Sequence, residues 1–125
     1  MLAKAKVMAT IAVRDLDAAR TFYEGVLGFR PPGSGEEGAI LYRSGTTQFL
    51  VYVSSYAGTN KATAATWAVG EDLEDTVRQL RSRGVAFEHY DDLPYMTRVG
   101  DIHEAGGTRL AWFKDPDGNI LALTG

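Results

Sequence analysis

The chain has 125 residues, of which 45% are hydrophobic, and this fits one soluble domain with little room for a second. It contains no cysteine, which excludes disulfides, thiolate zinc sites and cysteine nucleophiles. The formal net charge is -3, with 13 basic residues spread among 16 acidic ones, and this balance argues against a nucleic-acid partner.

In chain order, residues 1–10 lack the apolar core of a signal peptide. No later segment approaches the ~20 apolar residues that cross a bilayer, so we expect a cytoplasmic protein with no membrane partner. An apolar alternating run at 11–13, typical of a strand, leads to Asp15, which is a good N-cap residue. A helix is predicted to follow, with Gly28 as its C′ residue. Its apolar stripe consists of Leu16, Ala19, Phe22, Tyr23, Val26 and Leu27.

Beyond this helix the first half is predicted to contain a loop and two strands. The loop runs from Arg30 to Gly38, and the strands cover Ala39 to Arg43 and Gln48 to Ser54. Ser44-Gly45 is the turn signal between the strands. Ser55 to Thr63 is predicted to be a loop that leads into the second half.

The second half repeats this order at an offset of about 57 residues. Trp67 to Val69 leads to Asp72 as the N-cap of a helix that ends at Gly84, with Leu73, Val77 and Leu80 as its apolar stripe. Strands are predicted at Val85 to Tyr90, Thr108 to Lys114 and Ile120 to Thr124, and a loop at Asp91 to Gly107. Pro116 and Gly118 favour a turn between the last two strands. We expect one α+β domain over 1–125, with a first module of about 1–57 and a second of about 58–125.

Several short motifs occur in this repeated frame, namely Val13-Arg-Asp-Leu16, Phe22-Tyr-Glu24, Leu27-Gly-Phe29 and Asp115-Pro-Asp-Gly-Asn119. In this order and spacing the chain resembles the vicinal oxygen chelate superfamily (glyoxalase/bleomycin resistance protein/dioxygenase) over essentially its whole length. The resemblance implies tandem βαβββ modules whose half-open sheets enclose a cleft. It also implies a homodimer in which modules of both chains shape each cleft.

Catalytic members of this family hold a divalent metal with His, Gln or Glu side chains on inward-facing strand positions. The resemblance places those positions at Met8, Ala64 and Ala122, and at Leu50 or Tyr52. Hard divalent ions bind carboxylate oxygens or imidazole nitrogens, which methyl and thioether groups do not supply. We therefore expect no metal and no cofactor.

Strand alternation assigns the remaining inward positions. If Met8 and Ala64 point into the cleft, so do Thr10, Ala12, Thr66 and Ala68, while Ile11, Val13, Trp67 and Val69 belong to the core. Ile120, Ala122 and Thr124 share the cleft side, but the face used by Leu110 and Trp112 is undetermined. Tyr90, Tyr95 and Met96 are candidates for a lid. The predicted ligand-binding residues are Met8, Thr10, Leu50, Tyr52, Ala64, Thr66, Tyr95, Trp112 and Ala122.

Two functions follow from this pattern. The first is metal-free binding or sequestration of a small, flat or partly aromatic molecule, as in bleomycin-resistance proteins. The second is a glyoxalase-like lyase or isomerase, or a dioxygenase, with a metal on unidentified ligands or acid-base chemistry by His103 and Glu104 in a loop over the cleft. A pseudo-enzyme that acts through partner proteins is a third possibility, on which the sequence is silent.

Overall fold

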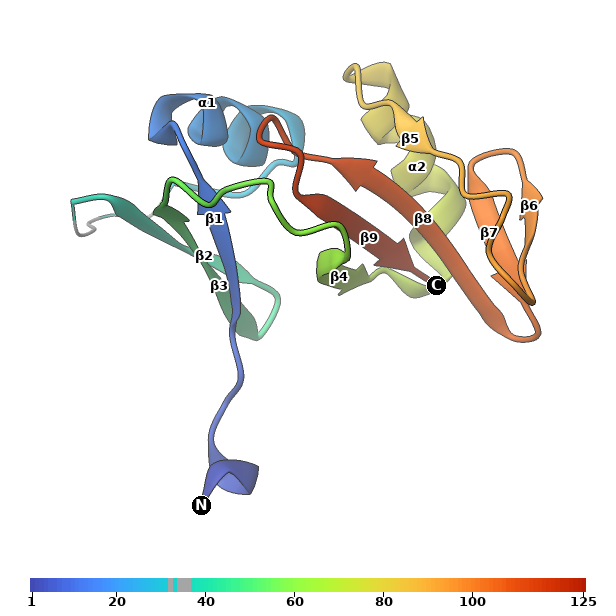
Figure 1. Ribbon diagram of the computed structural model, residues 1–125, viewed down its shortest axis with the longest axis horizontal. Coiled ribbons are helices and arrows are strands. Elements are labelled where there is room, and N and C mark those ends of the chain that lie inside the picture. The colour runs from blue at the N-terminus through green and yellow to red at the C-terminus, as the bar shows by residue number, and fades with distance from the viewer. Residues whose placement is uncertain (32, 34–36) are drawn as a thin grey trace.

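A computed structural model describes residues 1–31, 33 and 37–125. Two β-sheets lie beside each other, with helices packed on the same side of both (Figure 1). The helical elements are η1 (Leu2–Lys4), α1 (Leu16–Arg20), η2 (Thr21–Val26), η3 (Gly70–Asp72) and α2 (Leu73–Ser82). The strands are β1 (Ala9–Val13), β2 (Ala39–Ser44), β3 (Thr47–Val53), β4 (Thr63–Ala68), β5 (Phe87–Glu88), β6 (Thr97–Val99), β7 (Ile102–Ala105), β8 (Thr108–Lys114) and β9 (Ile120–Thr124). The expected α+β class and the repeated strand–helix–strand order are confirmed.

The first sheet has the strand order β1-β3-β2. β1 runs parallel to β3, with Thr10 opposite Leu50, and β2 is antiparallel to β3, with Leu41 opposite Leu50. Ile11 and Val13 are buried, whereas Thr10 is exposed, so one face of the sheet packs on the core as alternation predicts. Two described strands follow the first helix. Residues 32 and 34–36 of the predicted Arg30 to Gly38 loop lie outside the described residues.

The second sheet has the order β4-β9-β8-β7-β6, and β5 also pairs with β8. The strands predicted at Thr108 to Lys114 and Ile120 to Thr124 are confirmed, but the Val85 to Tyr90 strand shortens to Phe87–Glu88. The prediction of a loop over Asp91 to Gly107 was wrong, because this segment contains the β6–β7 hairpin. Its turn is Gly100-Asp101, and Gly100 has a φ of 63°.

The two helices begin differently. The Asp15 side chain accepts hydrogen bonds from the backbone N–H groups of Asp17 and Ala18, so the predicted N-cap is confirmed. The helix continues from Thr21 as a π-helix, and Gly28 follows it with a φ of 86°. Asp72 also precedes its helix, but its side chain makes no capping hydrogen bond, because η3 already leads into α2.

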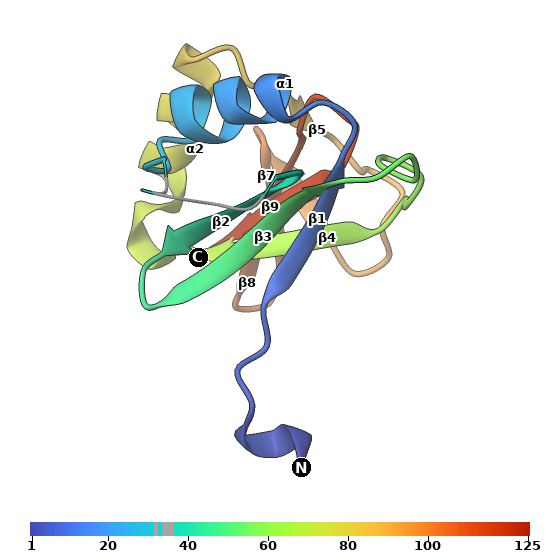
Figure 2. The same cartoon turned by 90° about the vertical axis from the view of Figure 1, so that its left-hand side faces the viewer.

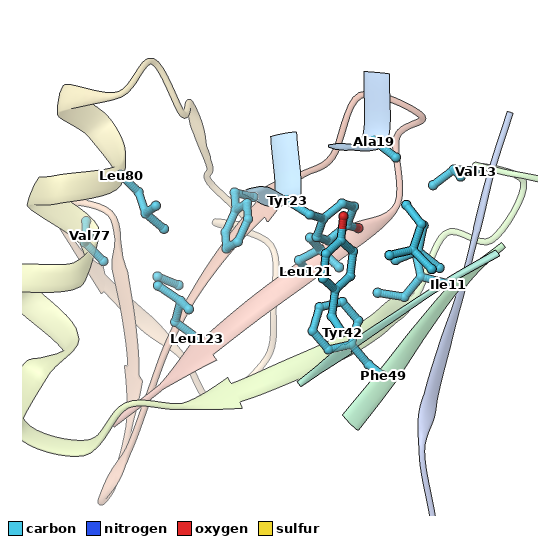
Figure 3. Packing of buried hydrophobic residues seen from close by; sticks show 14 of the residues in the cluster. Ile11, Val13, Ala19, Tyr23, Tyr42, Phe49, Val77, Leu80, Leu121 and Leu123 are labelled. Atoms are coloured by element: carbon cyan, nitrogen blue, oxygen red, sulfur yellow. The ribbon is translucent and has the colours of Figure 1, made fainter. Parts of the chain in front are cut away.

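One buried cluster joins both halves of the chain. Figure 3 shows Ile11, Tyr23 and Phe49 beside Leu121 of β9, while Val77 and Leu80 of α2 face Leu123. Burial of these apolar side chains is the main favourable contribution to folding. Because the cluster draws on both sheets and both helices, the two halves share one core.

The turn Asp115–Asn119, which we call the β8–β9 turn, fastens the two sheets together. The Tyr23 hydroxyl donates to Asp115 Oδ2 at 2.8 Å, and Asn119 Nδ2 donates to the Ala12 carbonyl at 2.7 Å. The Arg14 backbone N–H donates to Asp117 Oδ1 at 3.1 Å. The motif that carries much of the family resemblance therefore stabilises the structure by joining the second sheet to β1 and the first helix.

The N-terminal arm, residues 1–8, leaves the body of the molecule and ends in η1 (Figure 2). Leu2 and Val7 are exposed there. Among the described residues, no helix is long and apolar enough to cross a membrane.

Candidate functional site

The candidate site lies on the outer faces, by which we mean the side of each sheet that points away from the buried cluster. On the second sheet, Ala122 lies between Thr66 on β4 and Trp112 on β8 in the hydrogen-bonded register. Paired residues of neighbouring strands share a face. Ala111 and Phe113 belong to the core, so Trp112 lies on the outer face, which the sequence had left undetermined.

Strand β4 departs from simple alternation. A register shift between Thr63 and Ala65 interrupts its pairing with β9, and Ala64 packs against the buried cluster. The prediction that Ala64 lies beside Thr66 on the cleft side was therefore wrong, since a bulge moves one residue out of the alternation. Thr63 lies near the indole instead, and its hydroxyl accepts a hydrogen bond from Trp112 Nε1 at 3.1 Å.

The paired residues Thr66, Ala122 and Trp112 form a row across three strands. At its Trp112 end lies an aromatic cluster of Tyr90, His103 and Trp112. The Trp112 ring lies 4.9 Å from the His103 ring and 5.4 Å from the Tyr90 ring, both edge to face. The Tyr90 backbone N–H donates to His103 Nε2 at 2.9 Å. Among the described residues, neither the buried His103 Nδ1 nor the Tyr90 hydroxyl has a hydrogen-bond partner of good geometry. Burial lowers the pKa of His103, partly opposed by the Leu110 main chain, and raises the pKa of Tyr90.

The candidate acid-base pair diverges. His103 and Glu104 are consecutive residues of β7, so their side chains point to opposite faces. His103 is only 1% exposed, whereas Glu104 pairs with Arg109 at 3.4 Å. His103 had been expected in a loop over the cleft, but it lies in a strand, because the hairpin turn comes before it.

The remaining predicted residues lie apart from this group. Leu50 and Tyr52 are both on the outer face of the first sheet, opposite Thr10 and Ala12 respectively. Met8 precedes β1 and is 41% exposed. Tyr95 lies on the loop before β6, 95% exposed and with a φ of 68°. The predicted ligand-binding residues thus fall into one group on each sheet, with Tyr95 in neither.

Two hollows open at the β2–β3 end of the first sheet. One, of about 630 Å³, is lined by Gly28, Phe29, Arg30, Pro31, Gly33, Leu41, Arg43, Ser44, Gly45 and Gln48. The other, of about 880 Å³, is lined by Lys6, Val7, Met8, Arg43, Gly45, Thr46, Thr47 and Gln48. Arg43, Gly45 and Gln48 line both, so the hollows adjoin. Their volumes are in the range of small-molecule sites.

The side chains at the positions that the resemblance assigns to metal ligands do not fit a divalent metal. Ala122 has a methyl group between a hydroxyl and an indole, Ala64 lies at the bulge, and Met8 offers only a thioether. Leu50 is apolar, and the phenol of Tyr52 adds a single oxygen. Among residues 1–31, 33 and 37–125, no group of three His, Cys, Asp or Glu side chains gathers at a metal-binding distance.

Two residues of the candidate site, Thr63 and Arg43, were not singled out from the sequence, and His103 was singled out but expected in a loop. Thr63 depends on the bulge, which no local signal announces. The place of His103 could have been found, because Gly100-Asp101 between Val99 and Ile102 is a two-residue hairpin signal. Arg43 follows from alternation, since it is two residues beyond Leu41 and next to the buried Tyr42.

Comparison with known proteins identifies relatives of this fold. A family model described as Glyoxalase/Bleomycin resistance protein/Dioxygenase superfamily matches residues 6–123. No curated protein matches the chain. A bleomycin-binding protein complexed with bleomycin has a TM-score of 0.70 and 22% identity, and the match covers 97% of this chain and 98% of that chain.

Two further solved structures share the fold. TnmS3, an antibiotic-binding protein from Streptomyces sp. CB03234, has a TM-score of 0.63 and 18% identity, with 96% of this chain and 95% of that chain covered. The fosfomycin resistance protein FosX from Mesorhizobium loti has a TM-score of 0.66 and 14% identity, with 97% and 91% covered. At such identities the likeness shows the fold and not the activity. Because the family match spans nearly the whole chain, the protein belongs to the glyoxalase/bleomycin resistance protein/dioxygenase superfamily.

Proposed function

We propose that this protein binds and sequesters a small organic molecule, flat or partly aromatic, without a metal and without converting it. The observation that carries the proposal is the row Thr66–Ala122–Trp112. On the last strand, at the position that the resemblance assigns to a metal ligand, it has a small apolar side chain beside an indole. Apolar walls with a few hydroxyl groups are typical of sites for small organic molecules. The fold likeness to two antibiotic-binding proteins supports the same class.

The proposed cleft forms between two copies of the chain. The predicted ligand-binding residues form one group on each sheet of one chain, and the outer face of the first sheet exposes apolar side chains. Leu41 is 40% exposed and Tyr52 is 36% exposed. A two-fold dimer that sets the first sheet of one copy against the second sheet of the other would cover these side chains and create two equivalent clefts.

A thermal-shift screen of antibiotics, pigments and aromatic metabolites tests the proposal. A ligand at a hundred times its dissociation constant stabilises the folded state by ~2.7 kcal/mol, which raises the melting temperature by several degrees. Thr66→Trp should abolish the shift, because its indole would cover the outer face beside Ala122, where the ligand is proposed to bind. Thr66 is exposed, so the variant should fold. The control is Thr21→Trp, which adds the same side chain to an exposed position of η2.

Two further measurements distinguish binding from catalysis. Elemental analysis after gentle purification and dialysis should show no stoichiometric metal, and near one zinc, nickel, manganese or iron per chain would contradict the metal-free proposal. Each hit should be recovered unchanged by mass spectrometry. If a hit is converted and His103→Ala stops the conversion, the protein is an enzyme. If Thr66→Trp binds as the wild type does, the cleft lies elsewhere.

A further inference from the structure

Arg43 is the charged side chain on the outer face of the first sheet. It is exposed and lies opposite Gln48, with Leu41 two residues away on the same face. The neighbouring outer-face positions on β1 and β3 are uncharged, among them Thr10, Leu50 and Tyr52. Within the part of the chain that the structure describes, Arg43 forms no ion pair and no side-chain hydrogen bond.

The charges on the outer face of the second sheet are already paired. Lys114 Nζ lies 3.1 Å from Glu88 Oε1, and Arg98 Nε donates to Asp91 Oδ1 at 2.7 Å. Within each pair the positive charge is neutralised by the negative charge beside it. Counting the described residues alone, the first of the two outer faces carries the charge that has no partner. That charge is positive, although the chain as a whole has a formal net charge of -3.

The two adjoining hollows strengthen this positive character. Arg30 lines one with Arg43, Lys6 lines the other with Arg43, and no carboxylate among the described residues lines either. The amide of Gln48 and the hydroxyl of Thr46 add uncharged hydrogen-bond donors. Guanidinium groups bind carboxylate and other oxyanions through two parallel hydrogen bonds. Leu41 supplies an apolar surface beside these donors.

We propose that the ligand is an organic acid, whose anionic group binds at Arg43 and whose apolar part lies along Leu41 and Leu50. This inference rests on the proposed binding function and names the chemical class that the cleft takes. It differs from what the net charge alone suggests, since a mildly acidic protein would be expected to favour cations weakly. The local charge at the hollows determines the chemical class of the ligand, because salt screens the effect of distant charges.

Three probes with one ring system test the inference by calorimetric titration of the full chain. They are 2-naphthoate, 2-naphthamide and 2-naphthylmethylammonium, which differ in charge. We expect the acid to bind about tenfold more tightly than the amide, because hydrogen bonds to charged groups are stronger than those between neutral groups. The ammonium probe should bind most weakly. The preference for the acid should shrink as salt is added, since Arg43 is exposed.

Arg43→Gln keeps hydrogen-bonding capacity but removes the charge, so it should make the acid and the amide bind equally. Arg14→Gln is the matched control. Arg14 is also exposed, lines neither hollow and uses its backbone N–H, which the substitution retains, to contact Asp117. This control should keep the preference of the wild type. Equal binding of acid and amide by the wild type, or a preference that survives Arg43→Gln, overturns the inference.

The outcomes separate this inference from the proposed function. If acid and amide bind equally and Thr66→Trp abolishes both, sequestration stands and the anion site fails. If the acid is preferred but is converted to a product, the anion site stands and sequestration fails. If no ring probe binds, titration with inorganic sulfate decides the inference. A saturable shift of the Arg43 Nε–H signal in NMR spectra, absent at Arg14, supports it, and no shift overturns it.

Discussion

Gly58 lies where the chain after β3 passes close to the β8–β9 turn. A Cβ atom at this position would lie 1.9 Å from the Asp117 carbonyl oxygen, far inside van der Waals contact. The backbone φ of 73° is also in the left-handed region, which disfavours L side chains. Both features require glycine here, so position 58 is fixed by the approach of another backbone segment.

Gly58→Ala should therefore lower the free energy of unfolding by more than about 2 kcal/mol, because it adds a backbone clash to the left-handed strain. Urea denaturation measures this loss. Gly45→Ala is the control, with a φ of 57° but no atom within 4 Å of the added Cβ. It should lose only about 1 kcal/mol. Equal losses in the two variants would show that the clash at Asp117 is relieved by movement of the turn.

His103 predicts a pH dependence of stability. Burial lowers its pKa in the folded state below the ordinary value of 6.5, so below about pH 6.5 the unfolded chain binds more protons there than the folded one. The contribution of His103 to stability is complete above that pH and is lost as the pH falls toward the folded-state pKa. His103→Gln should flatten the fall in unfolding free energy between pH 7.5 and 5.

Denaturant titrations at several pH values give the comparison. His89→Gln serves as the control, because it removes the other histidine, which is exposed and contacts Asp101 at 2.7 Å. It should leave most of the slope in place. A His103→Gln variant with the full slope of the wild type would mean that carboxylates, and not His103, govern the acid side of the stability curve.

At the scale of elements, the two helix starts offer a matched pair. Asp15 accepts hydrogen bonds from the backbone N–H groups of Asp17 at 2.8 Å and of Ala18 at 3.4 Å. Asp72 stands at the same position before α2 and makes no such bond. Asp15→Ala should lower the unfolding free energy by about 1 kcal/mol, the usual cost of losing an N-cap.

Asp72→Ala should change the unfolding free energy by only a few tenths of a kcal/mol, leaving a small electrostatic effect on the helix N-terminus. Urea denaturation of both variants checks the difference. A loss of similar size in both would mean that the acidic charge, and not the hydrogen bonds of Asp15, stabilises the first helix.

Most elements were predictable because each has a local cause. Asp15 and Gly28 mark the ends of the first helical region, and Pro116 and Gly118 mark the turn between the last two strands. The β6–β7 hairpin was missed because its strands are short and polar, with Arg98 and Glu104 in their centres. The π-helical turn after Arg20 has no signal in the apolar spacing, since the same side chains face the core in either helix type.

At the scale of the whole molecule, we predict a homodimer. Light scattering on a sizing column should report about 27 kDa, twice the 13.6 kDa of one chain. The physical reason is the exposed apolar surface of the first sheet, where Leu41 and Tyr52 gain by burial. A monomer at tens of micromolar would contradict this and require each cleft to close within one chain. A dimer with a dissociation constant of ~10 µM has a binding free energy of about −7 kcal/mol.

The candidate site was only partly predictable. Alternation placed Thr10 and Thr66 on the cleft side of their strands, opposite to the core, and in the structure both side chains are exposed and lie away from the core. It failed at Ala64, where the pairing with β9 and not the local sequence decides which residue the bulge displaces. The positive character at Arg43 also escaped sequence reasoning, because net charge averages over the chain and the pairing of Lys114 with Glu88 exists only in the folded sheet.

The β8–β9 turn has a consequence for how the protein is made. The Ala12 carbonyl is synthesised early, but its hydrogen-bond donor, Asn119 Nδ2, is 107 residues further along the chain. At translation rates of ~5–20 residues per second, roughly 5–20 s pass between them. During that interval Ile11 and Phe49 lack the members of their buried cluster that β9 supplies, Leu121 and Leu123. The shared buried cluster can therefore be completed only after β9 has been synthesised, near the end of translation.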